Sequence, residues 1–102
     1  MHITKNLSVN DAVLARFCEA NAIIRLSVFG SALGDSFHEG SDVDILVEFD
    51  PLARIGLVRK AAIQNELSAM IGRHVDLRTP AELSEYFRQQ VLDSAEVRYV
   101  RR

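Results

Sequence analysis

The amino-acid sequence predicts an α+β fold, in which helices pack over one side of a small mixed β-sheet. Three segments repeat apolar residues with the period of a helix, and three shorter segments alternate apolar and polar residues as strands do. Along the chain they follow in the order helix, strand, strand, helix, strand, helix. The 102 residues, 48% hydrophobic and 25% charged, suffice for one hydrophobic core but not two, so we expect residues 1–102 to form a single domain.

The first helix is predicted to run from about Asn10 to Ala20. Ser8 to Asp11 have the form of a capping box with aspartate in the last place. Apolar residues follow this box at helical spacing: Leu14, Phe17 and Cys18. The next segment alternates apolar with other residues at Ile24, Leu26 and Val28. This pattern predicts a strand that ends at Gly30.

A second strand is predicted from Asp42 to Phe49, after a segment at 34–41 that is rich in turn-forming residues. Every second residue of this strand is apolar: Val43, Ile45, Val47 and Phe49. Because successive side chains of a strand point to opposite faces, these four residues should enter the core. Asp42 and Asp44 then point together to the other face.

The second helix should begin at Asp50 and reach about Ile71. Pro51 suits the first helical position, and Gly72 is a natural stop. Between these ends, Ile63, Leu67 and Ile71 form one apolar row along the helix. This row predicts the face that packs on the sheet.

A third strand is predicted at 74–78, with Asp76 on the face opposite to the strand's apolar residues. Thr79 to Glu82 then form a second capping box, with proline at the first helical position. A helical row of apolar residues follows: Leu83, Phe87, Val91, Ala95 and Tyr99. We therefore expect a long last helix, through which the chain could form a homodimer.

Composition and charge exclude several classes of function. The formal net charge is −2, with a pI near 5.9, so no overall positive field attracts nucleic acid, and we expect no direct nucleic-acid binding. The single cysteine, Cys18, cannot form an internal disulfide and should be a small buried hydrophobe. No apolar run approaches the ~18 residues of a membrane span, and the first ten residues do not resemble a signal peptide. These features favour a cytoplasmic protein.

A candidate nucleotide site lies between the first two predicted strands. Gly30 and Ser31 form a turn at a strand end, where backbone N–H groups can approach phosphate oxygens and the serine hydroxyl adds a donor. Ten residues later, Asp42 and Asp44 stand roughly 7 Å apart along one strand face, close enough to share a hard cation. The alternative is a pair of carboxylates on the solvated face of an antiparallel strand.

Asp76 strengthens the first interpretation, because a third carboxylate on a neighbouring strand could complete a cage for two divalent ions. Such a cage supports nucleotidyl transfer with two Mg²⁺ ions, which stabilise the charge that develops on the triphosphate. In this interpretation Asp42 and Asp44 bridge the metals. Asp76 is the third ligand, next to the attacking hydroxyl, and could help to remove its proton.

These residues together resemble a known family. The chain is similar to the minimal nucleotidyltransferase (MNT) domains of the polymerase-beta-like superfamily. The similarity rests on Gly30-Ser31, on Asp42-Val43-Asp44 after a gap of ten residues, and on the later Asp76. The resemblance covers nearly the whole chain. The spacing of the motifs, their placement on strands and the presence of the third acid all agree with the family. The resemblance implies a polymerase-beta-like nucleotidyltransferase fold. It also implies ATP as substrate and Mg²⁺ held by the three acids.

The resemblance further implies an antitoxin that transfers AMP from ATP to a tyrosine of a partner HEPN ribonuclease toxin and so silences it. Members of the family often carry an arginine in the loop after the Gly-Ser pair, where this chain has Gly34. Two alternatives remain open. One is a small-molecule nucleotidyltransferase of the aminoglycoside-modifying type, whose usual members carry an additional helical domain. The other is a module that inhibits a toxin by contact alone.

Overall fold

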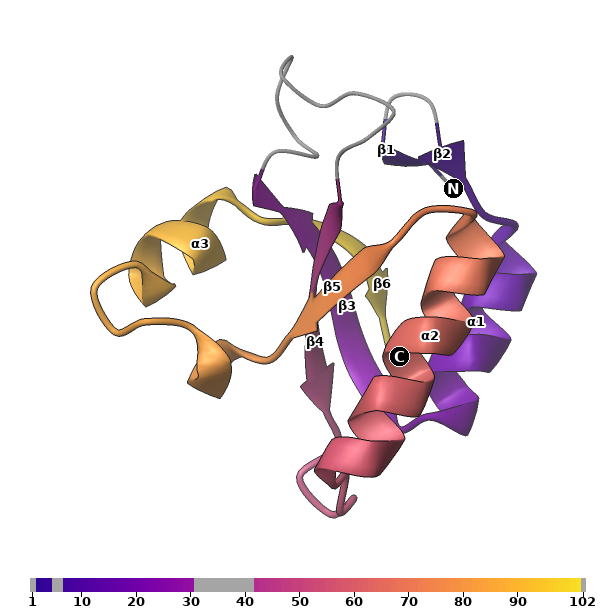
Figure 1. Ribbon diagram of the computed structural model, residues 1–102, viewed down its shortest axis with the longest axis horizontal. Helices are drawn as coiled ribbons and strands as arrows, with labels where there is room; N and C mark the ends of the chain where they lie inside the picture. The colour runs from indigo at the N-terminus through magenta and orange to yellow at the C-terminus, as the bar shows by residue number, and fades with distance from the viewer. Residues whose placement is uncertain (1, 5–6, 31–41, 102) are drawn as a thin grey trace.

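A computed structural model describes residues 2–4, 7–30 and 42–101 and confirms the predicted α+β class (Figure 1). A four-stranded mixed sheet carries helices on one face, and a small two-stranded sheet lies at the N-terminus. The elements are β1 (His2–Thr4), β2 (Leu7–Ser8), α1 (Asp11–Ala20), β3 (Ile23–Phe29), β4 (Val43–Phe49), α2 (Leu57–Ile71), β5 (Val75–Arg78), the 3₁₀ helix η2 (Pro80–Glu82), α3 (Arg88–Ser94) and β6 (Glu96–Val100).

The main sheet has the strand order β5-β4-β3-β6. β3 pairs with β4 and with β6 in antiparallel fashion, whereas β4 and β5 are parallel. A parallel pair needs a crossover connection, and α2 provides it between β4 and β5. The crossover therefore brings the start of β5 next to the start of β4, which is where the predicted acids lie.

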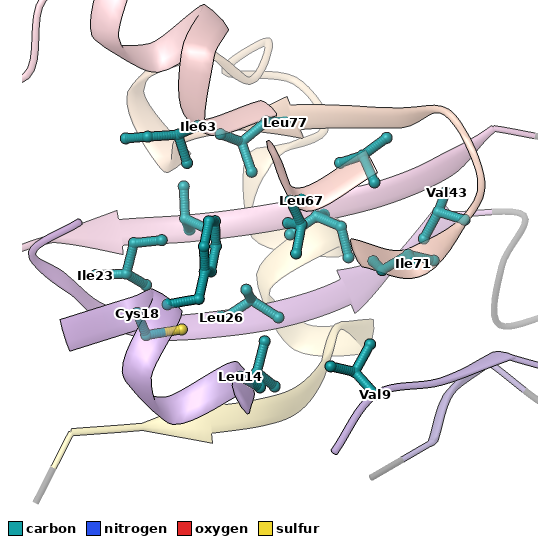
Figure 2. Packing of buried hydrophobic residues seen from close by; sticks show 14 of the residues in the cluster. Val9, Leu14, Cys18, Ile23, Leu26, Val43, Ile63, Leu67, Ile71 and Leu77 are labelled. Atoms are coloured by element: carbon teal, nitrogen blue, oxygen red, sulfur yellow. The ribbon is translucent and has the colours of Figure 1, made fainter. Parts of the chain in front are cut away.

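The hydrophobic core lies between the sheet and the two long helices (Figure 2). Leu14 and Cys18 of α1 and Leu67 of α2 are fully buried against sheet residues such as Leu26 and Val43. Both helices thus use the apolar faces that the sequence predicted. Burial raises the pKa of the Cys18 thiol to about 12, so this cysteine acts as a packed hydrophobe rather than as a nucleophile.

The first helix begins and ends as predicted, but a different residue caps it. The Asn10 side chain accepts hydrogen bonds from the backbone N–H groups of Ala12 (2.9 Å) and Val13 (3.2 Å). Asn10 is thus the N-cap, and the predicted capping box starting at Ser8 is wrong. Asparagine is as good a cap as serine, and it stands directly before the helix.

The second helix begins later than predicted, at Leu57 instead of Asp50. The Asp50 side chain accepts a hydrogen bond from the N–H of Leu52 (2.9 Å), and its backbone carbonyl accepts one from Ala53 (2.9 Å). These bonds close a turn instead of starting a helix, as aspartate often does. The predicted stop is confirmed, because Gly72 ends α2 in the left-handed region with φ 79°.

The predicted long last helix is wrong. The capping box at Thr79 is present, but it closes only η2, and Leu83 is already extended with ψ 144°. Ala95 is also extended, with ψ 140°, and ends the short α3. Strand β6 follows and pairs with β3. The hydrogen-bonding edge of β3 thus outweighs the helical spacing of the apolar residues, and the expectation of a dimer through a long helix loses its basis.

Candidate active site

The candidate site lies on the sheet face opposite to α1 and α2, where three neighbouring strands meet. Phe29 of β3 is directly opposite Asp44 of β4, and Asp44 is level with Asp76 of the parallel strand β5. Gly30 follows Phe29 directly, so the turn glycine and two of the predicted acids lie together across the sheet. The structure therefore brings Gly30, Asp44 and Asp76 together, whereas Ser31 and Gly34 lie outside the described residues.

The alternation of β4 determines which side chains face the site. Val43, Ile45 and Val47 are fully buried on the helical side of the sheet. Asp44, between them, is half-buried on the other face, and Asp42 precedes the strand and is exposed. The predicted separation of acids from core residues is thus confirmed for β4.

Gly30 makes room for the Asp44 carboxylate. Its φ of +71° lies in the left-handed region, which side chains disfavour. A Cβ atom at this position would collide with Oδ2 of Asp44 and stand 3.2 Å from its Cγ. The absence of a side chain at Gly30 therefore allows both the turn and the placement of the carboxylate.

Asp44 is the electrostatic centre of the cluster. Burial raises the pKa of its carboxyl group, and the nearby charges of Asp76 and Asp42 raise it further, while Arg78 opposes them. The charges of Asp76 and Asp42 therefore both act on Asp44. A bound cation would relieve this repulsion.

Among the described residues, His74 and Arg78 contact the acids. Nδ1 of His74 lies 3.3 Å from Oδ1 of Asp42, and both side chains are more than half exposed. Arg78 contacts Asp76 through Nε to Oδ1 (3.1 Å) and through Nη2 to Oδ2 (3.3 Å). Sequence reasoning assigned no role to Arg78, although alternation along β5 places it on the same face as Asp76.

The chemistry of the donors fits a hard divalent cation. Asp42, Asp44 and Asp76 offer only oxygen ligands, which Mg²⁺ prefers, and the repulsion that the other two exert on Asp44 favours a cation among them. Within the part of the chain that the structure describes, however, no three acidic, histidine or cysteine side chains converge into a ready metal cage. Asp76 is instead engaged by Arg78.

A glycine turn beside paired carboxylates, with a third acid on the next strand of a mixed sheet, defines a class of enzyme. These features are those of a nucleotidyltransferase, which holds a triphosphate through metal ions on such acids. Comparison with known proteins agrees with this class. The family described as nucleotidyltransferase domain matches residues 11–98, and the chain belongs to this family.

A relative from Thermococcus cleftensis, protein adenylyltransferase MntA, is 34% identical over 82 residues, which cover 80% of this chain and 79% of the relative. The structure of a toxin–antitoxin complex with AMP-PNP has a chain that matches with a TM-score of 0.71 at 20% identity, covering 92% of this chain and 76% of the other. The complex of a tri-AMPylated HEPN toxin with an MNT antitoxin from Shewanella oneidensis matches with a TM-score of 0.62 at 17% identity, covering 89% and 70%. The two structural matches show a shared fold.

The predicted relationship to minimal nucleotidyltransferases is thus confirmed. The chain is an enzyme of the nucleotidyltransferase class and acts on a nucleotide substrate. None of the helices in the described part of the chain is both long and apolar enough to cross a membrane.

Proposed function

We propose that this chain is an antitoxin that transfers AMP from ATP to a tyrosine hydroxyl of a partner HEPN ribonuclease toxin. The observation that carries the proposal is the position of Asp44 beside Gly30, in register with Asp76 and close to the charge of Asp42. Two comparisons support the choice of acceptor. The Thermococcus relative is named as a protein adenylyltransferase, and the toxin in the Shewanella complex is AMPylated.

The reaction joins the tyrosine oxygen to the α-phosphorus of ATP and breaks the bond from that phosphorus to the pyrophosphate. When bound, Mg²⁺ ions would neutralise the charge that develops on the phosphates. Asp42 and Asp44 would hold these ions, because they lie just before and just inside the start of β4 and offer only oxygen donors. The backbone turn at Gly30 and Ser31 would bind phosphate oxygens.

In the proposed reaction Asp76 has the role next to the acceptor. It lies on β5, one strand away from Asp44, and its side chain is 36% exposed. A carboxylate that an incoming tyrosine can reach is suited to accept the hydroxyl proton as the new bond forms. Asp76 would also complete the metal site as a third ligand.

A surface next to Asp76 suits a protein acceptor. Residues 79–95, which we call the C-terminal arm, continue from β5, and α3 within this arm lies apart from α1 and α2 (Figure 1). The arm contains no buried residue, yet Tyr86 and Phe87 are 85% and 61% exposed. Two adjacent exposed aromatic side chains are typical of a protein–protein contact.

Polar contacts fold the arm on itself and tie it to α2. The Arg88 side chain donates hydrogen bonds to the backbone carbonyls of Pro80 (2.8 Å) and Leu83 (3.0 Å). Lys60 of α2 forms an ion pair with Glu82 at 3.0 Å. The arm is thus anchored to the body of the protein while its aromatic side chains stay available to a partner.

We expect the double substitution Tyr86→Ser/Phe87→Ser to weaken toxin binding by at least about tenfold, because exposed aromatic residues are frequent hot spots. Titration calorimetry with a catalytically inactive toxin variant measures the affinity. Leu52→Ser is the matched control, since Leu52 is 92% exposed in the turn after β4, away from the site. Unchanged affinity of the double variant would remove the arm from the interface.

The proposed function is tested by the intact mass of the toxin after incubation with this chain, ATP and Mg²⁺. A gain in multiples of AMP, mapped to tyrosine by fragmentation, would establish protein AMP transfer. Continued inhibition of the ribonuclease without any mass gain would favour inhibition by contact alone.

Because ATP and the RNA substrate of a ribonuclease meet in the cytoplasm, this is where we place the activity.

A further inference from the structure

The guanidinium group of Arg78 contacts both carboxylate oxygens of Asp76, the third acid. Its Nε lies 3.1 Å from Oδ1 of Asp76 and its Nη2 lies 3.3 Å from Oδ2. The two N–H groups of a guanidinium form a planar fork that matches a carboxylate, so this contact fixes the orientation of Asp76 as well as balancing its charge. The last residue of β5 therefore controls the acid two positions earlier.

This ion pair lies beside the other two acids. Asp76 is level with Asp44 across the parallel pair of strands, and its charge raises the pKa of Asp44. Arg78 acts in the opposite direction on that pKa. Among the described residues, the titratable side chain of His74 also contacts the cluster and lies 3.3 Å from Asp42. Arg78 thus supplies positive charge at the place where a metal-dependent enzyme would need a cation.

We propose that Arg78 is a positioning residue for Asp76, which holds this carboxylate in the metal-free protein and releases it when a divalent cation binds. The ion pair must open before Asp76 can share a cation with Asp42 and Asp44 or accept a proton from tyrosine. Consistent with this, the acids in the described ranges form no closed metal cage while Asp76 is paired. This inference rests on the proposed metal-dependent function, but not on the identity of the acceptor.

The test measures metal binding without nucleotide or toxin. Mn²⁺ serves as the probe, because it takes the same oxygen ligands as Mg²⁺ and its free concentration can be followed by electron paramagnetic resonance. The side chains of Arg78 and Asp76 are 47% and 36% exposed, so breaking their pair costs little. We therefore expect Arg78→Gln to tighten Mn²⁺ binding by about two- to fivefold.

A double-mutant cycle separates this effect from a general change of charge. In the Asp76→Asn background, Arg78→Gln should change the Mn²⁺ affinity much less, because the pair no longer exists and only the effect of the Arg78 charge on Asp44 remains. Arg25→Gln is the control for charge alone. Arg25 forms a similar exposed pair with Glu48, at 3.6 Å, on strands β3 and β4, and its loss should change the affinity by less than the loss of Arg78.

An equal effect of Arg78→Gln with and without the Asp76 carboxylate would overturn the inference, since Arg78 would then act only through its field. Failure of the wild-type chain to bind Mn²⁺ would overturn the inference. AMP transfer to the toxin, measured separately with ATP and Mg²⁺, tests the proposed function on its own, so the failure of one is distinguished from the failure of the other. Circular dichroism of each variant establishes that the affinities belong to folded protein.

Discussion

Replacing Asp42 and Asp44 by asparagine is expected to lower AMP transfer by more than about a thousandfold, while the fold is kept. Both side chains lie on the sheet face opposite to the core, and Asp42 is exposed, so neither supports packing. Asparagine keeps the shape of the side chain but loses the negative charge that holds a divalent cation. The incorporation of labelled AMP into the toxin measures the effect.

Glu48→Gln is the matched control for this experiment. Glu48 lies on the same strand and the same face as Asp44, but it pairs with Arg25, at the far end of β4. Its substitution removes one charge from the strand without touching the cluster. Transfer that survives in the double variant would exclude Asp42 and Asp44 from the mechanism, and an equal loss with Glu48→Gln would point to a general effect of charge.

Asp44 also predicts how metal-free stability depends on pH. The pKa of Asp44 is raised in the folded protein, so the fold binds the proton more tightly than the unfolded chain does. Asp44 therefore lowers stability as pH rises through the carboxyl range, and the full loss is present at neutral pH. Without metal, Asp44→Asn should unfold at a higher temperature than wild type at pH 7. This difference should shrink as pH falls below the ordinary carboxyl range.

The core and the acids could be predicted because each follows from a local period. Val43, Ile45 and Val47 alternate with Asp44, and this alternation gives both the buried face and the site face of β4. The start of α1 and the stop of α2 also follow from short-range capping chemistry at Asn10–Asp11 and at Gly72. Local rules suffice where an element buries one clear face.

The segment after η2 escaped prediction because a distant strand decides its structure. Tyr99 belongs to the row that predicted a long helix, but it also alternates with Val97 in a strand pattern, and only the free edge of β3 selects the strand. Leu26 of β3 pairs with Tyr99, a contact that no short window of sequence reveals. The pair between Asp76 and Arg78, by contrast, was within reach, since residues two apart on a strand share a face.

Gly30→Ala is expected to lower AMP transfer by about a hundredfold, because displacing a group that holds a reacting centre by even a small distance has effects of this size. The new Cβ would collide with the Asp44 carboxylate, which must then rotate away from the cluster. The substitution also places alanine at a φ of +71°, which costs about 1–2 kcal/mol of stability. Kinetics of transfer and thermal unfolding measure the two effects.

Gly72→Ala separates the two effects, because Gly72 has a similar φ of +79° but no atom within 4 Å of an added Cβ. It should lose about the same stability from backbone strain, roughly 1–2 kcal/mol, and keep its transfer activity. If both alanine variants lose activity equally, strain of the fold explains the loss, and Gly30 has no particular role in placing Asp44.

The collision itself is tested in an Asp44→Ala background. Without the carboxylate, the nearest remaining atom to the new Cβ is Cβ of residue 44, at 3.5 Å, which is an ordinary contact. Gly30→Ala should then destabilise the protein only as much as Gly72→Ala does. An extra loss of stability that persists in the Asp44→Ala background would mean that the space at Gly30 serves the turn alone, whereas its disappearance would tie this glycine to the carboxylate on the neighbouring strand.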